Sequence, residues 1–434
     1  MRYKISLVLL SIILSASILS ARAEEELAWM TCVKEAKRDH PDLVAAKENL
    51  NQAKTSKEIT RSKVMPQITL NASEVTAKNA SSGNFNQASG SGSGGQQTTY
   101  EYGMTGQQLL FDGFKSSFDL SQAQRNINSA QYNYDVTSSN IRLRLRTAFV
   151  NLLTAQEFVK VTEEIEARRK QTLELVKLRY EGGREHKGSL MRSEADMAQA
   201  TYQVNQAKRS IYLYQRSLTK ELGRTIFIPM VAEGTLEVKE PVRERPSFEV
   251  IATTTPLLQQ LIAQKEAAKF GLKSANAALF PQIFVNGGMD NTNTVWPPDK
   301  NEWSVGTSLT WPIFDGGNKF ATITKTKAAL KQAEANERSG RDGVIFTLSN
   351  TWTQLQDAVD NVDVQQKSLD ASAERAKIAE AEYSTGLMTY DNWIIIEDDY
   401  VNAKLSYLTA QMAALTAKAS WIQAKGGTLD YDKD

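Results

Sequence analysis

An internal repeat constrains the fold of this 434-residue chain more than any other feature. The motif Met65-Pro66-Gln67-Ile68 returns 215 residues later as Phe280-Pro281-Gln282-Ile283, and Leu110-Phe111-Asp112-Gly113 returns 203 residues later as Ile313-Phe314-Asp315-Gly316. Fixed spacing over such a length predicts two copies of one structural unit. Four further pairs follow in the same order, each at a spacing of 215 or 203 residues: Pro41 with Pro256, Tyr180 with Tyr383, Gly183 with Gly386, and Gly223 with Gly426.

The two spacings differ by twelve residues, and the difference falls in one segment. Pro66 and Asp112 are 46 positions apart, whereas Pro281 and Asp315 are 34 apart. The longer segment contains two runs of Ser and Gly, at 81–83 and 90–95, a composition typical of flexible loops. We therefore expect an enlarged surface loop in the first copy.

The first 23 residues have the pattern of a secretory signal peptide. Arg2 and Lys4 precede an apolar stretch at 5–19, and Ala21-Arg22-Ala23 offers the small residues that a signal peptidase requires. We expect cleavage after Ala23. The alternative, an uncleaved anchor, needs about 20 apolar residues and is disfavoured by the short, serine-rich stretch.

Charge and composition exclude several classes of function. Loss of residues 1–23 removes three cations and no acids, which leaves 48 Lys+Arg against 50 Asp+Glu and gives no electrostatic footprint for nucleic acid. Cys32 is the single cysteine, so no intrachain disulfide forms, and its role is not predicted. The two histidines, His40 and His186, supply too few ligands for a transition metal. No catalytic constellation is present, so we expect neither an enzyme nor a cofactor or metal.

Strands with a period of two follow each Pro-Gln-Ile motif. In the second copy Trp303, Val305, Thr307, Leu309 and Trp311 alternate with small polar residues. Such alternation is typical of a transmembrane barrel with aromatic residues at its lipid interfaces, although a soluble sandwich shows it too. The export signal favours the membrane. Four aromatic residues are candidates for the lipid interface: Tyr100, Tyr102, Trp303 and Trp311.

Long helices separate the strands from two glycine turns. Apolar residues between Ile127 and Val159 keep a three-to-four spacing, which is the pattern of helices packed side by side. Asp112 to Tyr180 and Asp315 to Tyr383 both span 68 residues, which gives a helix about 100 Å long. A return helix then runs to Gly223 or Gly426. Seven residues are expected to form the turns: Asp112, Gly113, Asp315, Gly316, Gly317, Gly183 and Gly386.

The predicted domain organisation follows from these elements. Residues 1–23 form the signal peptide, 24–223 the first repeat, 224–254 a linker, and 255–434 the second repeat. Each repeat is a helix, a β-hairpin, a long helix, a turn and a return helix. Four strands per chain cannot close a barrel, two chains would give eight strands whose interior side chains fill, and three would give twelve strands around a lumen. We therefore expect a homotrimer.

Taken in order, the duplicated motifs resemble those of the TolC-like family of outer-membrane efflux and type I secretion channels. The carriers are the two Pro-Gln-Ile strand starts, the Phe-Asp-Gly turns, and the helix ends at Tyr180-Glu181-Gly182-Gly183 and Tyr383-Ser384-Thr385-Gly386. The resemblance implies a mixed, mainly α fold. It combines a trimeric, twelve-stranded transmembrane barrel in outer-membrane lipid with a long periplasmic α-helical barrel of coiled-coil-packed helices. It also implies a periplasmic adaptor (a membrane fusion protein) and an inner-membrane transporter as partners.

The resemblance extends only partly to the periplasmic gate. Tyr383 matches the family's gate tyrosine, but the gate arginine corresponds to Met388, and the aspartates fall at Asn392, Ile395 and Ser189. Other charges are available at the two turns. We hypothesise that Arg184 or Lys187 pairs with Asp391, within or between subunits, and unchanged single-channel conductance of Asp391→Ala in planar bilayers would contradict this.

The predicted function is passive export through an outer-membrane channel-tunnel of a tripartite efflux pump or type I secretion system. The alternative is a periplasmic coiled-coil adaptor, but an adaptor would carry one helical hairpin rather than two equal repeats. The sequence does not distinguish drugs, metal ions, peptides or proteins as the exported substrate.

Overall fold

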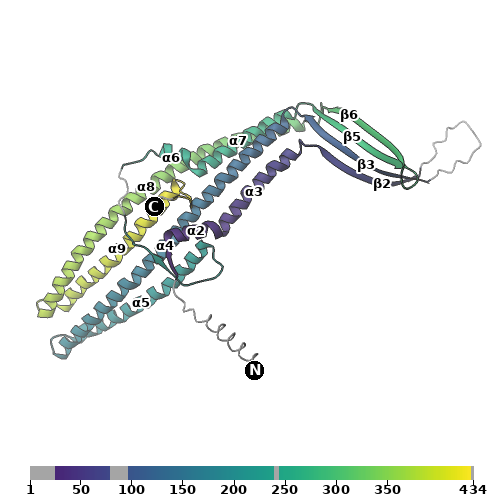
Figure 1. Cartoon of the computed structure of the whole chain (residues 1–434). Helices are drawn as coiled ribbons and strands as arrows, with labels where there is room; N and C mark the ends of the chain where they lie inside the picture. Colours follow the sequence, from purple (N-terminus) through teal and green to yellow (C-terminus); the bar gives the residue numbers. More distant parts are fainter. Residues whose placement is uncertain (1–24, 79–95, 239–243, 432–434) are drawn as a thin grey trace, which may run out of the picture. The chain divides into compact units, whose positions relative to one another are not determined.

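The computed structural model describes residues 25–78, 96–238 and 244–431. The predicted signal peptide and most of the enlarged loop lie outside these ranges. Both halves of the chain contain a helix, a hairpin, a long helix and a return helix (Figure 1). In the first half these are α3 (Pro41–Ser62), β2 (Gln67–Lys78), β3 (Gln96–Phe111), α4 (Lys115–Glu181) and α5 (Lys187–Leu222). In the second they are α7 (Pro256–Ala277), β5 (Gln282–Asn293), β6 (Lys300–Thr310), α8 (Asn318–Thr385) and α9 (Tyr390–Ala424).

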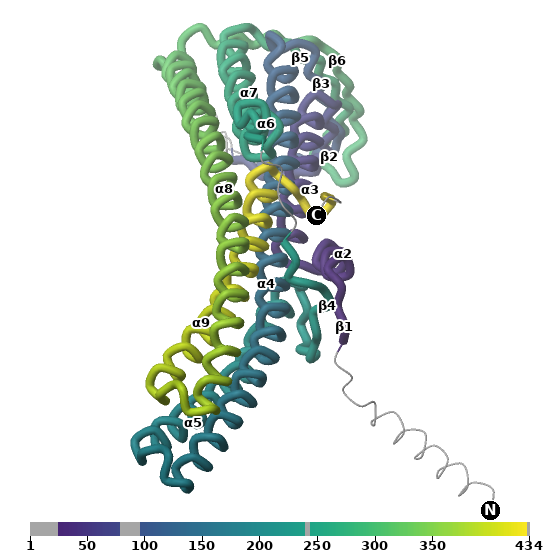
Figure 2. The backbone as a smooth tube through the Cα atoms, turned by 90° about the vertical axis from the view of Figure 1, so that its left-hand side faces the viewer, coloured from purple at the N-terminus to yellow at the C-terminus, as the bar shows by residue number. Residues whose placement is uncertain are grey.

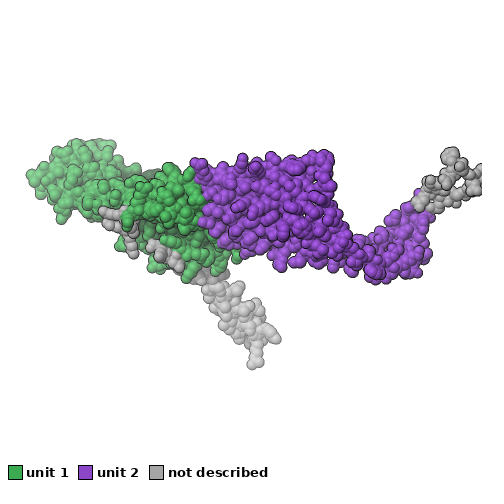
Figure 3. All heavy atoms as spheres, turned by 90° about the horizontal axis from the view of Figure 1, so that it is seen from above, with its two compact units in different colours: residues 1–47, 133–258, 341–434 green, residues 48–132, 259–340 purple. Residues whose placement is uncertain are grey.

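Short elements precede and join the two halves. They are β1 (Glu25–Ala28), α2 (Trp29–Asp39), β4 (Met230–Glu233) and α6 (Phe248–Thr254). The chain divides into two compact units, each built from both halves (Figure 3). Unit 1 holds residues 1–47, 133–258 and 341–434, and unit 2 holds residues 48–132 and 259–340.

Unit 2 contains a four-stranded antiparallel sheet in the order β2-β3-β5-β6. The central pair joins the halves, with Met104 opposite Met289 and Gly106 opposite Gly287. Strands β2 and β6 are the two edges, and neither has a second neighbour among the described strands. The backbone groups on their outer sides therefore lack strand partners within the described part of the chain.

The register confirms the predicted alternation. Leu70, Met104, Met289 and Trp303 lie in one row across the four strands, so they share a face. This apolar face is open to solvent in the single chain, with Leu70 80% and Trp303 78% exposed. Tyr100 and Tyr102 lie on the same face, and both contact the ring of Trp296. Trp311 follows β6 directly, and its Nε1 donates to the carbonyl of Leu279 at 3.0 Å.

The strand-to-helix turns depend on an aspartate cap and on left-handed backbone. Asp112 Oδ2 accepts the N–H of Ser116 at 2.8 Å, and Asp315 Oδ2 accepts that of Lys319 at 3.1 Å. Gly113, Gly316 and Gly317 have φ values of 69°, 69° and 88°. Phe114 stands where the second copy has Gly317, and it adopts the same conformation at φ 68°. A side chain there is strained, since L-residues rarely adopt positive φ.

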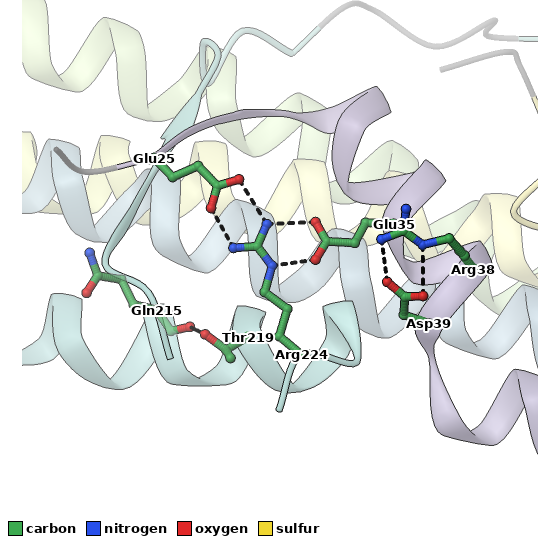
Figure 4. A network of polar contacts seen from close by, with 7 residues as sticks. All are labelled: Glu25, Glu35, Arg38, Asp39, Gln215, Thr219 and Arg224. Carbon is green, nitrogen blue, oxygen red and sulfur yellow. Dashed lines mark hydrogen bonds and ion pairs between the residues drawn. The ribbon is translucent and has the colours of Figure 1, made fainter. Parts of the chain in front are cut away.

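A half-buried arginine fixes the start of the described chain in unit 1. β1 pairs in parallel with β4, and Arg224 binds Glu25 and Glu35 through both of its guanidinium edges (Figure 4). These hydrogen bonds raise the pKa of Arg224 above its ordinary value. Cys32 is fully buried, and burial, with the Glu35 carboxylate as a further cause, raises its pKa to about 12, so the thiol stays protonated.

Close backbone contacts repeat in the two halves of unit 1. Gly223 ends α5 with φ 79°, and a Cβ there would lie 2.5 Å from the carbonyl oxygen of Asp39. Gly426, its counterpart after α9, has φ 85°, and a Cβ would lie 2.3 Å from Cδ of Pro256. In both copies the end of the return helix therefore touches the chain at the start of the first helix, where a larger residue does not fit.

Within the described ranges, no helix combines the length and the apolar character that crossing a membrane requires.

The two faces of β6 make a matched test of the lipid-facing assignment. An arginine at Val305 would lie on the apolar face, where it costs about 2–4 kcal/mol in a bilayer. An arginine at the neighbouring Ser304 would lie on the polar face. We expect Val305→Arg to lower the free energy of unfolding in lipid vesicles by that amount and Ser304→Arg to change it by less than about 1 kcal/mol. Equal losses would contradict the assignment.

Candidate functional site

The candidate site lies where α4 turns into α5 and α8 turns into α9. Both turns belong to unit 1, and they lie at the same end of the paired helices (Figure 2). Gly183 and Gly386 provide the left-handed residues, with φ 69° and 85°. Each turn is closed by a backbone hydrogen bond, from Arg184 N to Arg179 O and from Leu387 N to Glu382 O.

Tyr383 is the centre of the site and is fully buried. Its ring stacks on Trp393, with centroids 4.2 Å apart, and meets Tyr390 edge-on at 6.2 Å. The guanidinium of Arg179 lies 4.5 Å from the Tyr383 ring centre, and its Nη1 donates to the Tyr383 carbonyl at 2.6 Å. The cluster therefore joins α4, α8 and α9 through one side chain.

The Tyr383 hydroxyl connects this cluster to the first turn. It donates to Glu185 Oε2 at 2.9 Å, and the backbone N–H of His186 donates to Oε1 at 3.2 Å. Burial raises the pKa of Glu185, but hydrogen bonds from Ser189 and Tyr383 outweigh this and leave it below its ordinary value. Burial and the Glu185 carboxylate raise the pKa of Tyr383. Tyr383 is thus a neutral donor to a charged acceptor.

His186 fixes the backbone that carries Glu185. It is the N-cap of α5, and its Nδ1 accepts the N–H of Ser189 at 3.2 Å. Ser189 is almost fully buried. Because a capping side chain satisfies a helix N–H that has no partner in the helix, it stabilises the turn in this conformation.

A second layer of ion pairs lies further along the helices. Arg168 on α4 binds Glu397 on α9 through two hydrogen bonds, of 2.6 and 2.8 Å, and Glu380 on α8 at 3.3 Å. The Glu397 carboxylate is shielded from solvent, with 1% of its side chain exposed, whereas Arg168 is 32% exposed. Hydrogen bonding to Glu397 raises the pKa of Arg168. Arg169 pairs with Asp398 beside it.

The structure places the other predicted gate residues on the surface of the turns. Arg184, Lys187, Asp391 and Asn392 are all exposed. Within the described chain neither Arg184 nor Lys187 forms an ion pair with Asp391, so only pairing between subunits remains as a hypothesis. Ile395 is 58% exposed.

Several residues of the site were not found from the sequence. These are Arg179, Glu185 and Trp393 around Tyr383, and the pair of Arg168 with Glu397. The spacing of Tyr390 and Trp393 just after the turn was an available signal, because residues three apart share a helix face. The ion pairs gave no such signal, since their partners are some 229 positions apart.

The chain matches the family described as "Outer membrane efflux protein" over residues 32–224 and 251–427, and it belongs to this family.

Two relatives extend over most of the chain. The outer membrane efflux protein BepC of Brucella suis is 21% identical over 401 residues, which cover 88% of this chain and 84% of BepC. The outer membrane protein TolC of Vibrio cholerae is 20% identical over 377 residues, which cover 82% of this chain and 80% of TolC.

Solved structures share the fold. The CmeC outer membrane channel of Campylobacter jejuni matches with a TM-score of 0.81 and 17% identity, over 93% of this chain and 86% of CmeC. The open state of the MtrE channel of Neisseria gonorrhoeae matches with a TM-score of 0.80 and 19% identity, over 93% of this chain and 90% of MtrE.

Family membership confirms the predicted class, fold and location. The chain is an outer membrane efflux channel of the TolC-like family, and most of it is a helical periplasmic domain. It is a transport protein rather than an enzyme. The alternative of a coiled-coil adaptor is therefore wrong.

Loss of the Tyr383 hydroxyl tests the contact with Glu185. We expect Tyr383→Phe to weaken the turn by about 1 kcal/mol, because a hydrogen bond to a partly exposed charged group is lost. Hydrogen exchange of residues 179–190 measures this directly. Tyr180→Phe, at a partly exposed ring beside the same turn, is the matched control and should leave the exchange unchanged.

The same contact has a pH dependence of known sign. The folded pKa of Glu185 lies below the ordinary value of 4.5, so its contribution is present above pH 4.5 and is lost as the pH falls through the folded value. Protection of residues 179–190 should fall over that range in the wild type, and less steeply in Glu185→Gln. For the substitution test, equal hydrogen exchange of residues 179–190 in Tyr383→Phe and in the wild type would contradict a stabilising hydrogen bond between Tyr383 and Glu185.

Proposed function

We propose that three copies of this chain form one pore. The observation that carries the proposal is the open sheet of unit 2, whose edges β2 and β6 have no second strand and whose apolar face is exposed. Unpaired backbone groups are costly in lipid, so the edges need partners. Pairing β6 of one copy with β2 of the next satisfies both edges, and three copies give twelve strands around a lumen.

The exposed face of α8 supports the same arrangement. Phe346 is 71% and Val364 57% exposed in the single chain, whereas their counterparts on α4, Leu143 and Val161, are half-buried. The two helices are repeats of one element, yet α8 leaves apolar side chains uncovered. A neighbouring copy alongside α8 would cover them.

In the proposed channel, each segment of the chain has its own role. Residues 1–23 direct export and are removed, and residues 24–223 and 255–434 each supply one hairpin and one pair of long helices. Residues 224–254 form a band between them. The division by compact units cuts across this one, because each repeat contributes to both units.

The helix turns form the gate in this proposal. Tyr383, Arg179 and Glu185 hold α4, α8 and the turn between α4 and α5 together within one copy, through the contacts described above. Arg184 or Lys187 of one copy pairs with Asp391 of the next, since all three are exposed and none has an ion-pair partner in the described chain. Asn392 lies beside Asp391 on the same exposed turn. Threefold symmetry would multiply each such contact.

The partners we propose are a periplasmic adaptor and an inner-membrane transporter, in a tripartite efflux pump or a type I secretion system. The channel contributes passive passage, and the transporter selects the substrate. Support comes from two relatives named above, one described as an outer membrane efflux protein and the other as the outer membrane protein TolC.

Photo-crosslinking at the turns tests the partnership. Leu387 is 82% exposed between α8 and α9, and Leu309 is 63% exposed on the apolar face of the sheet. A photoreactive residue at Leu387 should capture a periplasmic adaptor in living cells, identified by mass spectrometry, and one at Leu309 should not. Cells that make all components and yield no adaptor adduct from Leu387 would contradict the proposal.

A further inference from the structure

We propose that Glu101, Asp290 and Glu302 make the pore selective for cations. This inference rests on the proposed trimeric channel, in which the polar face of the sheet lines the lumen. It concerns which ions pass, and it assigns a role to residues of unit 2.

The sheet register places the three carboxylates on the polar face. Asp290 of β5 lies directly opposite Glu302 of β6, and Gly103 of β3 lies on its other side. Glu101 lies in the next row, opposite Thr292. Side chains directly opposite on neighbouring strands have Cβ atoms about 5 Å apart, and like charges there are destabilising. The fold therefore tolerates a repulsive pair at this level of the sheet.

No cationic side chain of the described strands neutralises these three carboxylates. A Cβ at Gly103 would overlap the carboxylate of Asp290, at 1.8 Å from Oδ1, so Asp290 extends over the bare glycine. Lys300 is the one cation on this face of the four described strands, in the same row as Glu101. It forms no ion pair with any of the three acids in the described structure. The face therefore carries a net charge of −2 per chain.

The rest of the polar face is uncharged and rich in oxygen. A hollow of about 390 Å³ adjoins Asp290 and is lined by side chains such as Thr69, Thr105, Asn286 and Ser304, with glycine backbone between them. This lining suits hydrated ions and offers no cation to attract an anion. The described strands thus concentrate their lumenal charge in two adjacent rows.

Symmetry makes this charge effective. Three copies would place a net charge of −6 around two adjacent levels of the lumen, and the low dielectric of a surrounding membrane focuses such a field along the pore. Rings of Asp and Glu side chains are a general means by which pores favour cations. Screening by salt weakens the effect, so selectivity should be strongest at low ionic strength.

Reversal potentials in planar bilayers test the inference. Wild-type pores under a tenfold KCl gradient should pass K⁺ in preference to Cl⁻. The isosteric double variant Asp290→Asn with Glu302→Gln should lower the permeability ratio at least roughly threefold, and Lys300→Gln should raise it. Glu74→Gln is the matched control. It removes one carboxylate from the apolar face of the same sheet, opposite Tyr100, and should leave the ratio unchanged.

The outcomes separate this inference from the proposed function. Wild-type protein that forms no pore would overturn the proposed channel and the inference with it. Pores whose ratio is the same in the wild type and in the double variant would overturn the inference alone. A fall in the ratio with Glu74→Gln as large as with the double variant would also overturn it, because the effect would not depend on the lumenal face. The permeability ratio of the single variant Glu302→Gln should also fall, and an unchanged ratio would overturn the inference even where the double variant fails to fold.

Discussion

Unpaired backbone groups at the edges of the four-stranded sheet are the constraint on which the rest of the structure depends. Strands β2 and β6 each present one row of N–H and C=O groups with no partner in the described chain. Water satisfies such groups at a soluble surface, but hydrocarbon does not. The exposed apolar face that carries Leu70 and Trp303 is suited to hydrocarbon. In the proposed pore, other copies of the chain complete the sheet.

Duplication of the structural unit provides the strands of this sheet. The central pairing of β3 with β5 joins one hairpin from each half, so the halves contribute equally to the sheet. The helices of the two halves are also arranged alike, because Gly223 and Gly426 bring each return helix against the start of the first helix of its own repeat. The halves differ where function is concentrated. Glu185 and His186 of the first turn have no acidic or histidine counterparts at Met388 and Thr389.

Local patterns in the sequence predicted the elements well, and contacts between distant residues were out of reach. Period-two alternation identified the strands and their faces, and the spacing of Tyr180 and Tyr383 placed both helix turns. Phe114 was missed because nothing in the residue type signals a positive φ. The predicted pair of Arg184 or Lys187 with Asp391 does not form within the chain, and the structure instead joins the turns through Tyr383 and Glu185. Such pairings depend on how helices are rotated about their axes, which one sequence does not reveal.

The mass of the detergent-solubilised protein tests the central claim most directly. If the edges of the sheet are completed by other copies, native mass spectrometry should show three chains in one particle. Dissociation into single chains should occur together with loss of the strand signal in circular dichroism. A stable, monodisperse monomer that keeps its full strand content in detergent would contradict the account.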